Sequence, residues 1–177
     1  IESIPLVDLD PAMTRLFSTA PALRRLNADA LNSPKLRLIN SDALKWLEEN
    51  DERFDFIIID FPDPSNFAIG KLYSAAFYRL LAKRMHADSL AVIQSTSPFY
   101  ARQSFWCIVT TLESVGLTAT PYHALVPSFG EWGYVLVGRR AYRPPERYEV
   151  AMRFLTSETT PALFDFPKDM ARVDAEV

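Results

Sequence analysis

Short apolar runs along the chain alternate with segments in which apolar residues recur every third or fourth position. The clearest run is residues 54–59, Phe-Asp-Phe-Ile-Ile-Ile, which is rich in β-branched residues and is followed by polar ones. Such a run predicts a strand that is buried on both faces, as in a parallel sheet. Weaker runs predict further strands at residues 4–9, 36–39, 89–94, 117–125 and 134–139.

Segments with helical spacing lie between these strands. Asp10, Asp42 and Ser74 are predicted N-caps, and Gly116 is a predicted helix terminator. The predicted helices are residues 11 onward, as far as an interruption at Pro21, then 43–49, 75–85 and 98–115, with a short one at 161–164. Residues 61–70 are rich in Pro, Ser and Asn and predict a binding loop.

The alternation of strands and helices predicts an α/β fold with a mostly parallel sheet and crossover helices. Only residues 126–133 separate the last two strands, which is too short for a helical crossover, so we expect that pair to be antiparallel. A chain of 177 residues, 49% of them hydrophobic, can bury one sizeable core. We therefore predict one α/β domain over residues 1–140 and a C-terminal extension, residues 141–177, packed on it.

Charge and composition limit the classes of partner and the kind of protein that we expect. A formal net charge of −3 gives no basic footprint, so we expect no nucleic acid partner, whereas a cationic small molecule fits. With no long apolar run and no signal pattern, we expect this piece to be soluble. The chain lacks an initiator Met and opens on a strand-like segment, so we expect an upstream part outside this sequence. Cys107 stands among apolar residues, which predicts a buried thiol rather than a nucleophile.

Acidic residues stand at or just beyond the ends of three predicted strands: Asp8, Asp42 and the pair Asp60 and Asp63. Because the carboxyl ends of parallel strands share one edge, we expect these acids to converge on one cleft. Asp8 suits hydrogen bonds from ribose hydroxyls, and Asp42 suits contact with an adenine amino group. For both residues, capping of the following helix is an alternative of comparable or greater weight.

The pair Asp60 and Asp63 suits an amine substrate. We expect Asp60, at the end of an apolar strand and beside Phe61, to be partly desolvated, which favours a role as a base. Asp63, in a proline-stiffened loop, suits the binding of an ammonium group. The alternative is that each Asp caps backbone N–H groups of the loop.

Further polar and aromatic residues suit the same cleft. Gln94 and the following Ser-Thr-Ser (95–97) are candidate hydrogen-bonding groups, with ordinary strand-end polarity as the alternative. Tyr73, Phe129 and Trp132 are candidate apolar or cation–π walls, with ordinary packing of aromatic side chains as the more common alternative. The two histidines, His86 and His123, stand apart from each other and from Cys107, which gives metal ligation little support. The sequence has neither a Gly-x-Ser-x-Gly elbow nor a P-loop.

With these residues placed, the chain resembles the polyamine aminopropyltransferases, the spermidine synthase family, from about residue 4 to residue 139. The resemblance rests on the order and spacing of Val-Asp-Leu-Asp (7–10), Asn-Ser-Asp-Ala (40–43), Ile-Ile-Asp-Phe-Pro-Asp-Pro (58–64), Leu-Tyr-Ser-Ala-Ala-Phe-Tyr (72–78) and Val-Ile-Gln-Ser (92–95). Pro-Ser-Phe-Gly-Glu-Trp-Gly (127–133) resembles the bacterial branch in which this domain follows several membrane-spanning helices.

The resemblance implies a Rossmann-like fold, similar to S-adenosylmethionine-dependent methyltransferases. It also implies transfer of an aminopropyl group from decarboxylated S-adenosylmethionine to putrescine or a related amine, with release of methylthioadenosine, as in spermidine biosynthesis. No metal or other cofactor is implied, because decarboxylated S-adenosylmethionine is a co-substrate. The implied partners are the amine, the nucleoside and a second copy in a homodimer. The implied location is the cytoplasm, or the cytoplasmic face of a membrane where the full-length protein carries membrane helices.

By position, the resemblance implies that Asp60 is the catalytic base and Asp63 its partner in the amine site. It implies that Asp8 binds the ribose and that Asp42 contacts adenine. The family's Gly-Gly-Gly-Asp-Gly-like loop, first strand and N-terminal β-hairpin region have no counterpart here, since all five glycines lie at Gly70 or later. We therefore expect the C-terminal part of a catalytic domain.

Phe129 stands where many members of the family have Tyr, so a hydrogen bond to the amine is expected to be lost. The identity of the amine stays open for that reason. Two other functions remain as alternatives: a methyltransferase that uses S-adenosylmethionine, and a non-catalytic nucleoside- or polyamine-binding domain. The second carboxylate, Asp63, favours the aminopropyltransferase, because methyl transfer has no general need for it.

Overall fold

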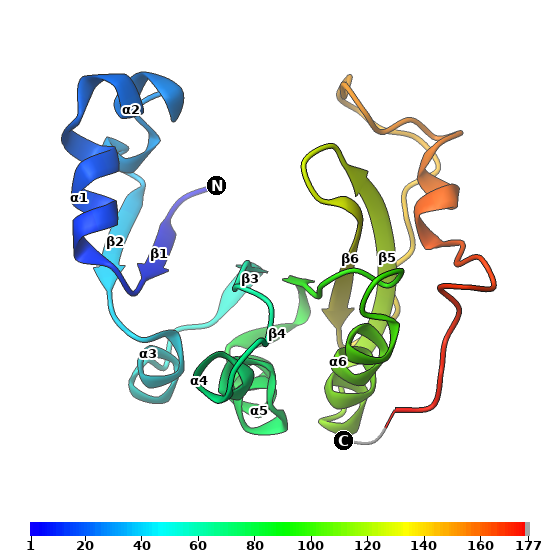
Figure 1. The fold of residues 1–177 in the computed structure, drawn as a ribbon. Helices are drawn as coiled ribbons and strands as arrows, with labels where there is room; N and C mark the ends of the chain where they lie inside the picture. The colour runs from blue at the N-terminus through cyan, green and yellow to red at the C-terminus, as the bar shows by residue number, and fades with distance from the viewer. Residues whose placement is uncertain (176–177) are drawn as a thin grey trace. The chain divides into compact units, whose positions relative to one another are not determined.

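The computed structural model describes residues 1–175, which form two compact units, Ile1–Asp51 and residues 52–175. Backbone hydrogen bonds join the strands into two sheets, one with the order β1-β2 and one with the order β3-β4-β6-β5 (Figure 1). The first sheet lies in the first unit and the second sheet in the second unit.

The first unit is a parallel β-α-β arrangement. β1 (Ile4–Asp8) pairs with β2 (Leu36–Asn40) in parallel, and α1 (Pro11–Thr19), α2 (Pro21–Leu26) and η1 (Ala30–Asn32) connect them. The Asp10 side chain caps α1 by accepting a 2.8 Å hydrogen bond from the backbone N–H of Ala12. Pro21 begins α2 at a position where a missing N–H costs nothing, which explains why it interrupts the first helix without ending the helical region. α3 (Ala43–Glu49) follows β2.

The second unit begins with a parallel strand pair and ends with an antiparallel hairpin. β3 (Phe54–Ile59) pairs in parallel with β4 (Met85–Gln94), and α5 (Ala75–Lys83) is part of the crossover between them. β6 (Gly130–Gly138) runs antiparallel to both β4 and β5 (Thr118–Val126). α6 (Arg102–Ser114) packs against β5 and β6. The expected α/β fold and the antiparallel final pair are confirmed.

The core of the second unit is formed by apolar side chains that α5, α6, β4 and β6 direct inward. Alternate residues of β4, Ser89, Ala91 and Ile93, are buried, as expected for one face of a strand. Their buried partners are Phe77, Tyr78 and Leu81 from α5, Phe105, Val109 and Leu112 from α6, and Val135 and Val137 from β6. Burying an aliphatic or phenylalanine side chain of this kind contributes about 1.5–3 kcal/mol.

The C-terminal segment packs along α6 and β5. The Trp106 indole donates a 2.9 Å hydrogen bond to the Met170 carbonyl, and the Phe166 ring lies 5.2 Å from the Trp106 ring. η3 (Thr160–Phe164) lies against β5. Whether residues 141–177 are an extension of a single domain stays a prediction. Among residues 1–175, no helix has the length and apolar character needed to cross a bilayer.

Several boundaries differ from those predicted. The expected loop 61–70 contains α4 (Phe67–Gly70), because the Asn66 side chain accepts a hydrogen bond from the Ile69 N–H and caps a helical turn; η2 (Lys71–Tyr73) follows it. The helix predicted at 98–115, α6, begins at Arg102 rather than at Pro98, because the Ser97 hydroxyl accepts hydrogen bonds from the N–H groups of Phe99 and Tyr100 and forms a turn first. Strands β4 and β6 each begin four residues earlier than predicted, at Met85 and Gly130.

Candidate active site

Asp60 directly follows β3 and lies in solvent. The last residue of the strand, Ile59, is 6% exposed, whereas the Asp60 side chain is exposed. The expected partial desolvation of Asp60 is therefore wrong. The reason is the direction taken by Phe61, whose ring packs edge-on against the rings of Tyr73 (6.4 Å) and Phe77 (5.6 Å) and so does not cover Asp60.

Asp63 is held at both carboxylate oxygens. Oδ1 accepts a 2.9 Å hydrogen bond from the Gln94 side-chain amide, and Oδ2 accepts a 2.9 Å hydrogen bond from the Thr96 hydroxyl. Both donors are neutral, so they orient the carboxylate without cancelling its charge. The convergence of Asp63 and Gln94 follows from the parallel pairing of β3 and β4, which brings the carboxyl ends of both strands to one edge.

Tyr73 extends this network and fixes the orientation of the Gln94 amide. Its hydroxyl lies 2.9 Å from Gln94 Oε1, and 3.2 and 3.3 Å from the carbonyl oxygens of Phe61 and Pro62. Because Gln94 Oε1 accepts from Tyr73, its NH₂ group faces Asp63. Burial raises the pKa of Tyr73 well above its usual range, and the charges of Asp63 and Asp60 raise that pKa further. The phenol therefore remains a hydrogen-bond donor at any pH near neutral.

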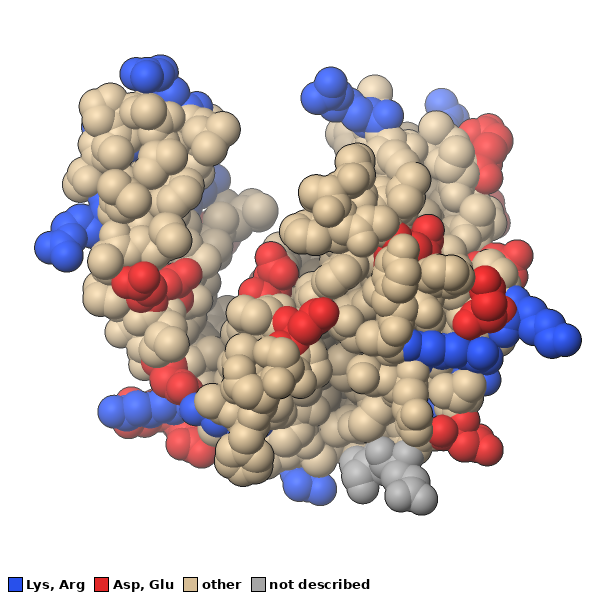
Figure 2. Space-filling model, in the orientation of Figure 1, with Lys and Arg blue, Asp and Glu red and all other residues tan. Residues whose placement is uncertain are grey.

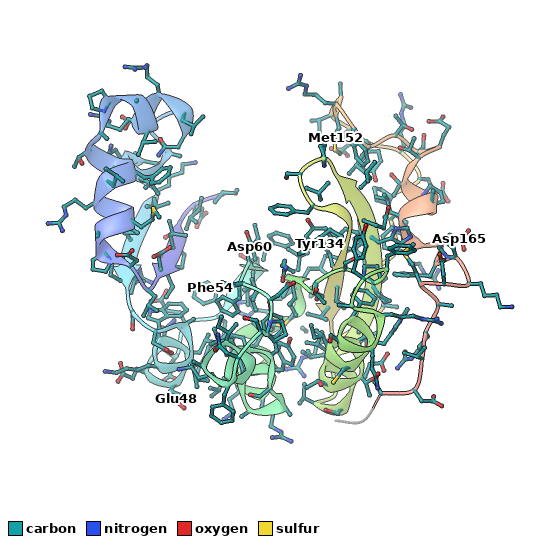
Figure 3. The ribbon with its side chains drawn as sticks, in the orientation of Figure 1. Glu48, Phe54, Asp60, Tyr134, Met152 and Asp165 are labelled. Atoms are coloured by element: carbon teal, nitrogen blue, oxygen red, sulfur yellow. The ribbon has the colours of Figure 1, made fainter. Side chains whose placement is uncertain are left out.

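Tyr134 brings β6 to the same edge. It pairs with Gln94 in the register between β6 and β4. Partial burial raises the pKa of Tyr134, and the negative charge of Asp60 adds to this effect. Figure 3 shows Asp60 at the end of β3 and Tyr134 on β6, and Figure 2 shows acidic side chains exposed beside the carboxyl end of β3.

Residues 95–97 connect this edge to β6. The Ser95 N–H donates to the Gly133 carbonyl (3.0 Å), and the Gly133 N–H donates to the Thr96 carbonyl (2.7 Å). The Ser97 hydroxyl donates to the Glu131 carbonyl (2.6 Å). Consequently the segment that carries Thr96 is attached at three points to the neighbouring strand.

Gly133 allows this close approach because it has no side chain. A Cβ atom at this position would lie 2.4 Å from Cε2 of Phe105 and 2.7 Å from the Thr96 carbonyl oxygen. We expect Gly133→Ala to lower the free energy of unfolding by roughly 1–3 kcal/mol, since overpacking forces neighbours to shift. Denaturant unfolding measures this. Gly70→Ala is the matched control, because its Cβ meets nothing within 4 Å; an equal loss in both variants would contradict the steric explanation.

Three other residues considered in the sequence are Phe129, Trp132 and Cys107. The rings of Phe129 and Trp132 pack on each other at 5.3 Å at the start of β6, with Phe129 63% exposed. Their roles as walls of the site stay predictions. Cys107 is half-buried rather than fully buried, because it lies on the flank of α6 between the buried Trp106 and Ile108.

Metal ligation has no geometric support in the described residues. Residues 1–175 contain no cluster of three or more His, Cys, Asp or Glu side chains suited to a metal ion. His123 instead faces two protein acceptors, the Glu131 carboxylate through Nδ1 and the Asp165 carbonyl through Nε2 (2.8 Å). These contacts link β5 and β6 to the C-terminal segment.

Asp42 caps α3 as the sequence allowed, whereas α1 is capped by Asp10 and the Asp8 side chain bonds to the backbone of that capping residue. Asp8 Oδ1 accepts a 2.7 Å hydrogen bond from the Asp10 N–H. Asp42 Oδ1 accepts from the N–H groups of Leu44 (2.9 Å) and Lys45 (3.2 Å) at the start of α3. Ribose and adenine binding by these two residues, and their convergence with Asp60 and Asp63, stay predictions.

The sequence did not single out Thr96, Tyr134 or Gly133. Thr96 was one of three hydroxyl residues after Gln94. The signal that could have distinguished Thr96 from Ser95 is its position two residues after Gln94. Positions 94 and 96 both bond to Asp63, whereas the Ser95 hydroxyl bonds to the Ile93 carbonyl. Tyr134 and Gly133 depend on the pairing of β6 with β4, which no local pattern specifies.

Comparisons with known proteins agree with one another. The model of the family described as "Spermine/spermidine synthase domain" matches residues 1–144. Polyamine aminopropyltransferase 2 of Ralstonia nicotianae is 52% identical over 99% of this chain, which covers 35% of that protein. The polyamine aminopropyltransferase of Leptospira interrogans is 48% identical over 100% of this chain and 36% of its own length. The chain thus spans about a third of the length of these relatives.

Two solved structures share the fold at low identity. The crystal structure of spermidine synthase from Thermotoga maritima superposes with a TM-score of 0.78 at 18% identity, over 96% of this chain and 60% of that one. A spermidine synthase in complex with the transition-state analogue AdoDATO gives a TM-score of 0.80 at 19% identity, over 96% and 61% of the two chains. These likenesses confirm the Rossmann-like fold.

Proposed function

The chain belongs to the spermine/spermidine synthase domain family, and from this premise we propose that it is part of the catalytic domain of a polyamine aminopropyltransferase. The proposed reaction transfers an aminopropyl group from decarboxylated S-adenosylmethionine to putrescine or a related amine. The observation that carries the proposal is the Asp63 carboxylate, held at both oxygens by neutral donors near a second, solvent-exposed carboxylate, Asp60.

The amine substrate explains why two carboxylates are needed. An aliphatic amine has a pKa of about 10, so at neutral pH it arrives as an ammonium ion. Asp63 is oriented to bind one ammonium group, because Gln94 and Thr96 aim its oxygens without neutralising them. The attacking nitrogen must lose a proton before its lone pair can react, and Asp60 is the proposed acceptor of that proton.

The chemical step then balances without a further acid. A C–N bond forms between the amine and the aminopropyl carbon while the C–S bond of the sulfonium breaks. Methylthioadenosine departs as a neutral thioether, which needs no protonation. Holding the two substrates in line supplies much of the remaining acceleration. The phenols of Tyr73 and Tyr134, whose pKa values are raised, stay neutral beside this step.

The nucleoside side of the proposal involves the first unit. Asp8 is the proposed acceptor of hydrogen bonds from the ribose hydroxyls. Asp42 is the proposed acceptor for the adenine amino group. In each residue Oδ1 accepts backbone hydrogen bonds, which fixes the side chain in one rotamer. A fixed carboxylate costs less conformational entropy when it binds a ligand. The support for this part is the family match across residues 1–144.

The test uses the full-length protein that contains this chain. Incubation with decarboxylated S-adenosylmethionine and a panel of diamines, triamines and monoamines should release methylthioadenosine with at least one diamine or triamine. A parallel series with S-adenosylmethionine scores S-adenosylhomocysteine. If none of the amines in the panel led to release of methylthioadenosine, the proposal would be overturned. Release of S-adenosylhomocysteine instead would indicate methyl transfer, and binding of amine and nucleoside without either product would indicate a non-catalytic domain.

A further inference from the structure

Thr96 has a backbone conformation that its residue type disfavours. Its φ is 62°, in the left-handed region, and its side chain is 4% exposed. Two other non-glycine residues in the described chain, Ala28 and Asp29, also have positive φ, but Thr96 is the β-branched one of the three. A β-branched residue in this region is a genuine outlier, and such outliers persist only where surrounding contacts hold them in place.

β6 supplies the contacts that hold Thr96. The Gly133 N–H donates a 2.7 Å hydrogen bond to the Thr96 carbonyl, and hydrogen bonds from Ser95 and Ser97 to Gly133 and Glu131 attach the residues on either side. The bare Cα of Gly133 permits this contact, since a Cβ would lie 2.7 Å from the same carbonyl oxygen. The strained conformation is therefore enforced from the neighbouring strand.

The left-handed turn has one consequence at the site. After Gln94 the chain turns so that the Thr96 hydroxyl reaches Asp63 Oδ2 at 2.9 Å, while Gln94 itself reaches Oδ1 at 2.9 Å. A carboxylate that is bonded at one oxygen can rotate about its Cβ–Cγ bond. A carboxylate that is bonded at both oxygens has its plane fixed, which leaves defined lone-pair directions for an incoming cation.

We propose that Thr96 is a positioning residue for the amine, which acts through Asp63 by fixing the plane of its carboxylate, and that its strained backbone places the hydroxyl for this contact. The proposal deepens and rests on the proposed aminopropyltransferase function. Gln94 sets one oxygen of Asp63 and Thr96 sets the other, so loss of the Thr96 hydroxyl leaves the carboxylate half-held. The expected cost falls on binding of the amine and leaves binding of the nucleoside unchanged.

Three substitutions in the full-length protein separate positioning from stability. Thr96→Val keeps the branched shape and removes the hydroxyl, Thr96→Ser keeps the hydroxyl, and Thr96→Gly removes the hydroxyl and also relieves the backbone strain. Thr111→Val is the matched control, because Thr111 is similarly buried (6% exposed) and its hydroxyl bonds to the Cys107 carbonyl within α6.

We expect Thr96→Val and Thr96→Gly to raise the KM for the amine roughly tenfold, with the KM for decarboxylated S-adenosylmethionine unchanged. Thr96→Ser should restore the wild-type amine KM. Thr96→Gly should also have a Tm near that of the wild type, because relief of the strained φ offsets the lost hydroxyl contact and the greater freedom of glycine in the unfolded chain. A protein of wild-type stability that binds amine less tightly is an outcome that a merely structural role does not produce.

Unchanged amine KM in both Thr96→Val and Thr96→Gly would overturn the proposal, as would an equal rise in the KM for both substrates. The Thr111→Val control should match the wild type in both KM values. Calorimetric titration of the amine, with methylthioadenosine present, gives a readout that does not depend on turnover. If the wild-type protein bound the amine but released no methylthioadenosine, the proposed function would fail while the same titration still decided the role of Thr96.

Discussion

Replacing Asp60 by asparagine is expected to lower kcat by about 10²–10⁴-fold, the usual contribution of a general base. Asparagine has the shape of aspartate but cannot take the proton of the attacking ammonium group. Because Asp60 is exposed and follows the buried Ile59, the change should leave folding unaltered. Methylthioadenosine release by the full-length protein at saturating substrates measures the loss, and calorimetric titration with decarboxylated S-adenosylmethionine should show nearly unchanged binding.

Asp55→Asn is the matched control for Asp60→Asn, since Asp55 is an exposed carboxylate on the same strand. It should retain wild-type turnover. Raising the pH towards 10 should restore part of the activity of Asp60→Asn, because the fraction of free amine then grows without help from a base. Loss of nucleoside binding in Asp60→Asn would mean that the role of Asp60 is misassigned, and retained turnover at neutral pH would remove it as the base.

Replacing Asp63 by asparagine is expected to raise the KM for the amine by roughly 10–100-fold, the cost of a lost charge-assisted hydrogen bond. The hydrogen-bond network can survive the change. The asparagine oxygen can still accept from Gln94, and its NH₂ group can donate to the Thr96 hydroxyl, which can reverse its role from donor to acceptor. The substitution therefore removes the charge and keeps the geometry.

Steady-state kinetics with each substrate varied in turn tests the Asp63 prediction. The KM for decarboxylated S-adenosylmethionine should stay at the wild-type value, and kcat at saturating amine should fall much less than in Asp60→Asn. The Asp55→Asn variant again serves as the control for loss of one carboxylate charge. An unchanged amine KM would show that Asp63 does not bind the ammonium group.

The strand β3 and the meeting of Asp63 with Gln94 could be predicted from sequence because both follow from simple rules. A continuous β-branched run specifies a strand, and parallel neighbours end at one edge. The expected burial of β3 on both faces is wrong, because Phe56 is 55% and Ile58 70% exposed on one face. The exposure of Asp60 could not be predicted in the same way. It depends on the side to which Phe61 turns, and that is decided by the rings of Tyr73 and Phe77, which arrive from a later part of the chain.

Thr96 shows a second limit of prediction from sequence. Its side chain disfavours a left-handed backbone, so local preference indicates the wrong conformation. The correct conformation is set by β6, more than thirty residues downstream, through the Gly133 N–H. The start of β6 was missed for a related reason: glycines at 130 and 133 are typical of a loop, whereas here Gly133 makes room for Phe105 and for the Thr96 carbonyl.

The exposure of Asp60 also bears on what happens after the chemical step. In the proposed reaction each cycle would leave a proton on this carboxylate, and that proton would have to leave before the next amine could be deprotonated. A carboxyl group in contact with water exchanges its proton directly with solvent and buffer, so the second unit needs no chain of internal donors and acceptors to clear it. In this proposal the hydrogen-bonded Tyr73, Gln94 and Asp63 position the amine, and Asp60 loses its proton to the surrounding water.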